Sequence, residues 1–94
     1  MPEMTFEVRW PDGQVTDCYS PSLVMHDFLT AGESYPLADF VARSTTALGV
    51  ASERVQAKYG FACTSALQQE AEIRELAAAQ PGGVVEVLRM EPGL

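Results

Sequence analysis

The sequence predicts an α+β fold, in which an amino-terminal β-hairpin, two or three helices and a carboxyl-terminal strand follow one another in a single domain, 1–94. Apolar and polar residues alternate over 4–10, apolar residues recur every three or four positions over 37–55, and 84–90 is rich in β-branched residues. These patterns are typical of strand, helix and strand, respectively. We expect the strands to form a small, mostly antiparallel sheet with the helices on one face.

The first expected element is the hairpin. Over 4–10 apolar residues occupy alternate positions, which is the period of a half-buried strand. Pro11-Asp12-Gly13 then favours a three-residue loop, because proline presets the first turn dihedral and glycine accepts a positive φ. The register that keeps the apolar residues of the second strand, 14–19, on one face pairs Phe6 with Cys18, so the thiol is expected in the core.

The second strand ends at Ser20-Pro21-Ser22, because proline cannot donate a hydrogen bond to a strand ladder. Leu23 to Leu29 is a short apolar stretch whose type stays open. Ala31-Gly32-Glu33-Ser34 is expected to be a loop, since small and polar residues interrupt the apolar pattern there.

The clearest helix begins near Leu37, and Gly60 is placed to end it, since glycine adopts the left-handed conformation that follows many helices. Gly49 costs about 1 kcal/mol relative to alanine inside a helix, so the sequence leaves open whether this segment is one helix or two. The apolar stripe consists of Leu37, Phe40, Val41, Ser44, Leu48, Ala51 and Val55.

A further helix is expected from Ser65 through about Ala79, because Ser65 and Gln68 have the spacing of a capping box. Pro81-Gly82-Gly83 ends it as a turn. The residues that this helix should bury are Ala66, Ile73, Leu76 and Ala77.

In the last strand simple alternation places Val85 and Val87 on one face and Val84, Leu88 and Met90 on the other. A small sheet with one layer of helices would leave one of these apolar sets half exposed. We therefore expect self-association or a partner surface there.

Charge and composition limit the function. Thirteen acidic and six basic residues give a net charge of −7, which repels phosphate backbones and anionic membranes. We expect no nucleic-acid partner and no membrane partner. The sequence contains no apolar run long enough for a signal peptide or a transmembrane helix, so we expect a cytoplasmic protein with reduced thiols at Cys18 and Cys63.

Few residues offer catalytic or metal chemistry. The soft or imidazole ligands are Cys18, Cys63 and His26, without metal-binding spacing, so we expect no metal and no cofactor. Cys63 precedes the second helix, where a thiolate is stabilised, although it also suits packing at the helix corner. Nothing in the spacing brings His26 to it as a base. A helix-turn-helix over 47–55 is disfavoured against one amphipathic helix, because the surrounding charge opposes DNA.

Five segments together resemble a family of small bacterial proteins named for a nitrogen-starvation response. The resemblance covers most of the chain to about residue 76. It rests on Met4-Thr5-Phe6 with Val8-Arg9-Trp10-Pro11-Asp12-Gly13, Cys18-Tyr19-Ser20-Pro21-Ser22, Tyr35-Pro36-Leu37-Ala38-Asp39-Phe40, Ala51-Ser52-Glu53-Arg54-Val55, and Lys58-Tyr59-Gly60-Phe61 with Cys63.

The resemblance implies a genetic context and no catalytic roles. Members of the family are typically encoded beside a nitrilase-type enzyme, a radical enzyme of the S-adenosylmethionine class, an acetyltransferase-like protein and a flavoprotein. This context is associated with obtaining nitrogen from nitriles or cyanide. The resemblance assigns no catalytic role to any residue of this sequence.

Two hypotheses of function follow. The favoured one is a small acidic, non-catalytic accessory or interaction protein that dimerises or docks on an enzyme of that pathway. The alternative is a small-molecule-binding protein or thiol-dependent enzyme component, in which Tyr19, Arg54 and Cys63 surround a cleft between sheet and helices.

Overall fold

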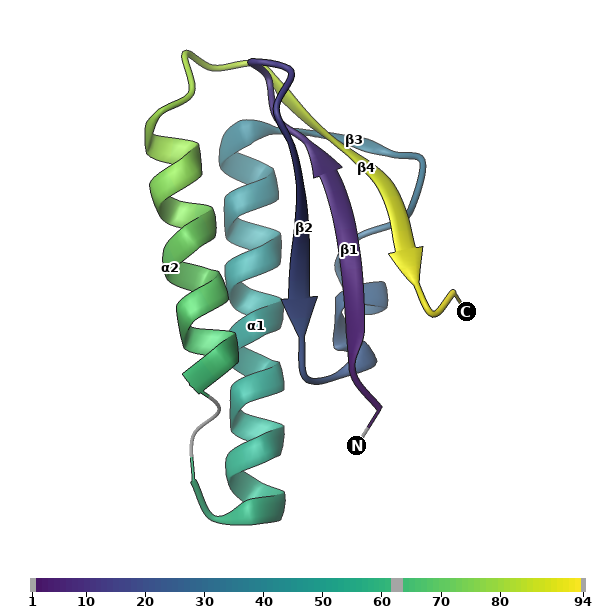
Figure 1. The fold of residues 1–94 in the computed structure, drawn as a ribbon, viewed down its shortest axis with the longest axis vertical. Helices are drawn as coiled ribbons and strands as arrows, with labels where there is room; N and C mark the ends of the chain where they lie inside the picture. The colour runs from purple at the N-terminus through teal and green to yellow at the C-terminus, as the bar shows by residue number, and fades with distance from the viewer. Residues whose placement is uncertain (1, 62–63, 94) are drawn as a thin grey trace.

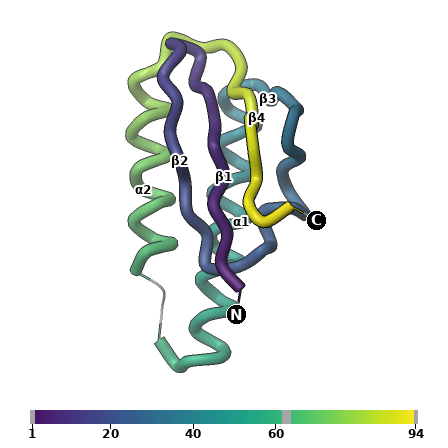
Figure 2. The backbone as a smooth tube through the Cα atoms, turned by 45° about the vertical axis from the view of Figure 1, so that its right-hand side comes forward, coloured from purple at the N-terminus to yellow at the C-terminus, as the bar shows by residue number. Residues whose placement is uncertain are grey.

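The computed structural model describes residues 2–61 and 64–93, and it confirms the α+β fold class (Figure 1). The elements are, in chain order, β1 (Met4–Arg9), β2 (Val15–Ser20), the 3-10 helix η1 (Leu23–Asp27), β3 (Ser34–Pro36), α1 (Leu37–Tyr59), α2 (Thr64–Ala78) and β4 (Val84–Glu91). Both α-helices cover the same face of the sheet, so the molecule has two layers (Figures 1 and 2).

The sheet has the strand order β2-β1-β4-β3, and all neighbouring strands are antiparallel. The predicted hairpin register is confirmed, because Phe6 pairs with Cys18 and Val8 with Thr16. The Trp10 N–H donates to the Gln14 carbonyl at 2.8 Å, and Gly13 has a φ of 91°, so the loop closes as the turn residues predict. β1 and β4 occupy the centre of the sheet (Figure 2).

The fourth strand, β3, was not expected. The loop prediction for Ala31-Gly32-Glu33-Ser34 is wrong at its last residue, because Ser34 begins β3 and pairs with Glu86 of β4. The ladder extends irregularly before β3, where the Gly32 N–H donates to the Val87 carbonyl at 2.7 Å. A strand of three residues that contains a proline is too short to show the alternation of apolar and polar residues that predicts a strand. It forms because it pairs with β4.

The expected two-sided apolar pattern of β4 is wrong for Met90. Glu7 pairs with Arg89 whereas Val8 pairs with Val87, so Leu88 is an extra residue in β4 and forms a β-bulge. The bulge shifts the alternation by one residue, and Met90 therefore points to the same face as Val87. Met90 is 5% exposed and belongs to the core.

Ion pairs cross the face of the sheet that points away from the helices. Arg9 Nη1 lies 3.1 Å from Glu86 Oε1, and Arg89 Nη2 lies 3.5 Å from Glu7 Oε2, each pair formed by residues directly opposite in β1 and β4. Met90 does not belong to the apolar set predicted for this face, whereas Val84 is 54% exposed. The partner surface expected there stays a prediction.

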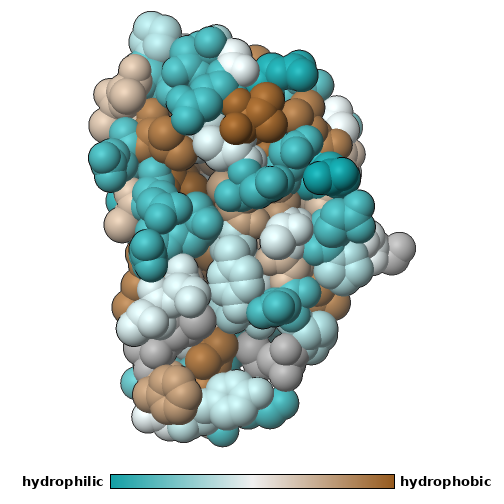
Figure 3. Space-filling model, viewed as in Figure 1, coloured by the Kyte–Doolittle hydropathy of each residue, from teal (hydrophilic) through white to brown (hydrophobic). Residues whose placement is uncertain are grey.

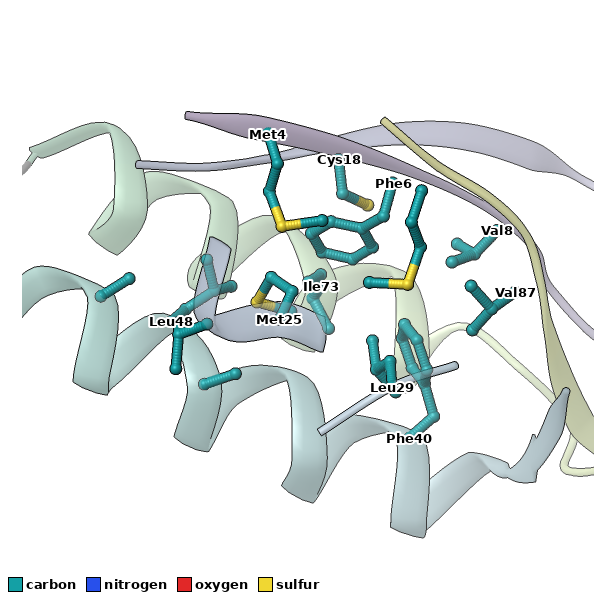
Figure 4. Close-up of a cluster of buried hydrophobic side chains, with 14 of the residues drawn as sticks. Met4, Phe6, Val8, Cys18, Met25, Leu29, Phe40, Leu48, Ile73 and Val87 are labelled. Carbon is teal, nitrogen blue, oxygen red and sulfur yellow. The ribbon is translucent and has the colours of Figure 1, made fainter. Parts of the chain in front are cut away.

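The core lies between the sheet and the helices (Figure 4). Phe6 and Val8 of β1 point down from the sheet, and Phe40 of α1 and Ile73 of α2 point up toward them (Figure 4). Trp10 packs edge-on against Phe40 with ring centroids 5.5 Å apart, and its indole N–H donates to Thr16 Oγ1 at 3.0 Å. The largest buried side chains thus join the first strand to the start of the long helix.

η1 resolves the open assignment of 23–29. Ser22 precedes it with extended backbone and its hydroxyl accepts a hydrogen bond from the Val24 N–H. Val24 and Met25 are buried, and Met25 lies between Met4 of the sheet and Leu48 of α1 (Figure 4). This short helix therefore fills the space between the sheet and the middle of α1.

α1 is one continuous helix, so Gly49 does not divide it and the helix-turn-helix is absent. Gly60 ends it with a φ of 82° and donates its N–H to the Gln56 carbonyl at 2.8 Å, as predicted. Its 23 residues span about 34 Å, whereas the eight residues of β4 span about 27 Å. The carboxyl-terminal end of α1 consequently extends past the sheet (Figure 1).

α2 begins at Thr64, so Ser65 lies inside the helix and the predicted capping box does not begin it. Ala66 and Ile73 are buried as expected, whereas Leu76 and Ala77 are only partly buried. No helix in 2–61 or 64–93, the long α1 included, is apolar enough over a sufficient length to cross a membrane.

The bulge in β4 is open to a direct test. Met90→Ala removes a buried side chain from the core and should lower the free energy of unfolding by about 2–5 kcal/mol. Leu88→Ala, at the partly exposed bulge residue, should cost less than half as much. Chemical denaturation of both variants measures the difference, and equal costs would mean that β4 alternates without a bulge.

Candidate functional site

The structure describes two of the three predicted site residues. Tyr19 lies on β2, Arg54 lies on the penultimate turn of α1, and Cys63 lies outside the described residues. The two described residues each take part in a contact that holds the fold together. The predicted cleft includes Cys63, so it stays a prediction.

Tyr19 forms one wall of an open, polar hollow between β2 and α2, with a volume of about 240 Å³. Its backbone N–H donates to Gln69 Oε1 at 3.0 Å, and its hydroxyl donates to Glu3 Oε2 at 3.0 Å. The remaining wall consists of Ser65, Gln68 and Glu72. Amides, hydroxyls and one carboxylate can hold a small polar ligand by hydrogen bonds, and they supply no nucleophile paired with a base.

Gln69 is the residue of this hollow that the sequence analysis missed. It is 8% exposed, although it stands on the buried stripe of α2 between Ala66 and Ile73. Its side-chain oxygen satisfies an N–H of the edge strand β2, which the helix thereby covers. The sequence signal for this contact is a polar residue at a position where the helical stripe is otherwise apolar.

Arg54 joins α1 to the corner after β2. Its Nη1 donates to Ser22 Oγ at 3.2 Å, and the same hydroxyl also accepts from the Val24 N–H at 3.3 Å. The Ser20 hydroxyl in turn donates to the Ser22 carbonyl at 2.8 Å. Arg54 thus positions the segment that leads into η1.

The other groups considered for chemistry are also held in structural contacts. Cys18 is 2% exposed, and burial raises the pKa of its thiol from 9.0 to about 12. His26 Nε2 lies 2.9 Å from the Pro92 carbonyl oxygen. No group of three or more metal-ligating side chains occurs within 2–61 and 64–93. The pairing of His26 with Cys63, which the spacing does not favour, involves a residue outside that range.

The helical layer carries a second, apolar hollow. It is a groove of about 680 Å³ between the amino-terminal half of α1 and the carboxyl-terminal end of α2. Arg74 is its only charged residue, and its guanidinium is 3.0 Å from Glu70. The rest of the lining consists of Leu37, Ala38, Val41, Ala42, Thr45, Ala77 and Ala78.

Large apolar side chains are exposed at the opposite end of the same two helices. Tyr59, Phe61 and Leu67 are 51%, 64% and 49% exposed, and the rings of Tyr59 and Phe61 lie 6.2 Å apart. In Figure 3 hydrophobic and pale groups gather at the lower end of the molecule, which the carboxyl-terminal end of α1 forms (Figure 1). We call these three residues the apolar tip.

A family model matches residues 5–90 of the chain. The matching family is described as nitrogen starvation-induced protein NitG. The chain belongs to this family. No curated protein and no solved structure matches the chain.

Membership of the NitG family confirms the nitrogen-starvation resemblance, which the sequence motifs had indicated over most of the same range. The family description names the condition that induces its members, nitrogen starvation, and assigns no role to any residue.

The buried thiol of this NitG protein should be unreactive. In a Cys63→Ser variant Cys18 is the sole thiol, and at pH 8 its raised pKa leaves a thiolate fraction about a thousandfold below that of a free cysteine. Labelling with a chromogenic disulfide should be at least that much slower in native buffer than in denaturant. Fast native labelling of this variant would show that β2 opens readily.

The same thiol makes stability depend on pH. The unfolded chain loses the Cys18 proton near 9.0, whereas the folded chain keeps it up to about 12. Its contribution is complete below pH 9, and the free energy of unfolding falls as the pH rises toward 12. Urea titrations at pH 8, 10 and 11 should show a steeper decline for the parent protein than for Cys18→Ala, and equal slopes would contradict the assignment.

Proposed function

We propose that this NitG protein is a small acidic, non-catalytic accessory protein that acts by binding other proteins during nitrogen starvation. We further propose that it serves the assimilation of nitrogen from nitriles or cyanide in the cytoplasm, as the genetic context of the family implies. The proposal rests on which side chains are exposed to solvent and which are held in contacts within the fold.

One observation carries the proposal: several large apolar side chains are exposed, whereas the described groups considered for chemistry are engaged in the fold. Five large apolar residues are 46–64% exposed among the described residues. By contrast, Arg54 is bonded to Ser22, His26 to Pro92, and Cys18 is buried. Exposed apolar side chains on a small domain mark surfaces that bind other proteins.

The surface charge supports binding to proteins. Four of the six basic residues form ion pairs with carboxylates, in Arg9–Glu86, Arg43–Asp39, Arg74–Glu70 and Arg89–Glu7. The excess acidic charge of −7 then disfavours phosphate and anionic lipid.

Co-purification from the native host tests the proposal. The tagged protein, produced at its natural level in cells grown on a nitrile or on cyanide as nitrogen source, should bring down an enzyme of nitrogen assimilation in comparable amount. The same cells grown on ammonium provide the control. Ammonia release from nitrile or cyanide by the purified protein alone would replace the proposal with an enzyme.

Two substitutions separate this function from the thiol-dependent alternative. Cys63→Ser and Tyr19→Phe should leave growth on the nitrile unchanged, because neither removes an exposed apolar side chain named above. A loss of growth with either variant, at unchanged protein level, would favour the alternative in which Cys63 and Tyr19 act on a small molecule.

A further inference from the structure

We infer that this protein forms an antiparallel homodimer through the outer face of its helical layer, with the two-fold axis at Gly49. The inference goes beyond the proposed accessory role, because two copies can pair whether or not an enzyme of the pathway binds. The inference is based on the outer face of the helices, on which an apolar groove lies at one end and the apolar tip at the other. When two copies face each other in opposite directions, the tip of each copy meets the groove of the other.

The groove and the apolar tip lie on one face of the helix pair. On α1, Tyr59 follows Val41 by eighteen residues, which is five whole turns, so both point in the same direction. On α2, Leu67 precedes Arg74 and Ala78 by seven and eleven residues, close to two and three turns. An exposed apolar end and an apolar groove therefore occupy opposite ends of the same surface.

Gly49 stands midway between them. Leu37, at the start of the groove, lies twelve residues before it, and Phe61 lies twelve residues after it. A two-fold axis at Gly49 reverses α1 onto itself, so the apolar tip of each copy meets the groove of the other. The contact is then made twice, and it closes as a dimer.

The glycine itself has no explanation within one chain. It lies inside a continuous helix, where glycine costs about 1 kcal/mol relative to alanine, and its φ is not positive. A Cβ at this position would meet no heavy atom within 4 Å outside its own helical turns. At the crossing of two helices the absence of a side chain lets the axes approach closely, because the distance between helix axes follows the size of the contacting residues.

Charge also matches across the proposed axis. The reversed register places Glu53 of one copy opposite Thr45 of the second copy, and Thr45 lines the groove together with Arg74. Arg74 is the groove's one charge, and Glu53 is an exposed carboxylate that forms no ion pair with the described residues. Glu53 thus supplies a second partner for the groove's cation.

The face approaches the size of a stable interface. α1 is about 34 Å long, α2 is about 22 Å long and each helix is about 10 Å wide, which gives a flat area of about 560 Å² per copy. Stable interfaces bury about 800 Å² per partner.

Sedimentation equilibrium of the full chain should give twice the chain mass at micromolar concentration. Glu53→Arg and Arg74→Glu should each weaken the dimer about tenfold, and the double variant should restore it. Gly49→Leu should abolish it, although the open space at this position lets the chain fold. A monomer at all concentrations, or a dimer that these variants do not change, would overturn the inference.

Cross-linking tests the axis itself, because a residue on a two-fold axis meets its own copy. In a Cys63→Ser background, with Cys18 buried, Gly49→Cys should form a disulfide-linked dimer when copper phenanthroline and air supply the oxidant. The matched control Val15→Cys, 46% exposed on β2, should stay monomeric on a denaturing gel. Cross-linking of the control alone would place the interface on the sheet and overturn the helical one.

Failure of the dimer leaves the co-purification experiment intact, since a monomer can still bind an enzyme. A dimer that brings down no enzyme would, conversely, contradict the accessory role alone.

Discussion

The packing of one long helix against a shorter sheet is the constraint on which the rest of the structure depends. Trp10 and Phe6 pack against the layer formed by α1 and α2. Trp10, Phe6 and Phe40 of α1 are each at most 1% exposed. Because α1 is longer than the strands, its buried residues run from Phe40 to Val55 and its carboxyl-terminal end extends beyond the sheet (Figure 1). Tyr59 lies at that uncovered end and is 51% exposed.

The same mismatch explains the short elements. η1 fills the space between the sheet and α1, and Arg54 holds the corner that leads into it through Ser22. β3 connects that region to the start of α1 and pairs with β4, while the Leu37 N–H donates to the Gly83 carbonyl at 3.0 Å. These segments are too short to form by their own propensity, and long-range contacts decide their conformation.

The sequence could predict the elements whose pattern is local. The hairpin register follows from alternation and Pro11-Asp12-Gly13, and the end of α1 follows from Gly60, because each signal lies within a few residues of the structure that it causes. The bulge at Leu88 has no such signal, since an extra residue is defined only against the partner strand. Gln69 likewise acts on Tyr19, fifty positions away, so its burial depends on the packing of α2 against β2.

Site prediction was limited for a related physical reason. Arginine, tyrosine and cysteine serve chemistry and packing alike, and the difference lies in what surrounds them. Arg54 meets a hydroxyl that the fold requires, and Cys18 meets an apolar core that keeps it protonated. Residue type therefore indicated that Arg54 and Cys18 make important contacts, whereas the tertiary structure was needed to show what those contacts do.

The two faces of the molecule differ in how they treat charge. On the sheet, Glu7 and Arg9 meet Arg89 and Glu86 across the central strands, so each charge has a partner and the face stays hydrated. On the outer face of the helices an apolar groove contains one cation, Arg74. Two copies with a charge of −7 repel each other at long range, so they can meet only where few like charges face each other. Contact through the helical groove would desolvate one ion pair in each copy, Arg74–Glu70, whereas contact through the sheet would desolvate two.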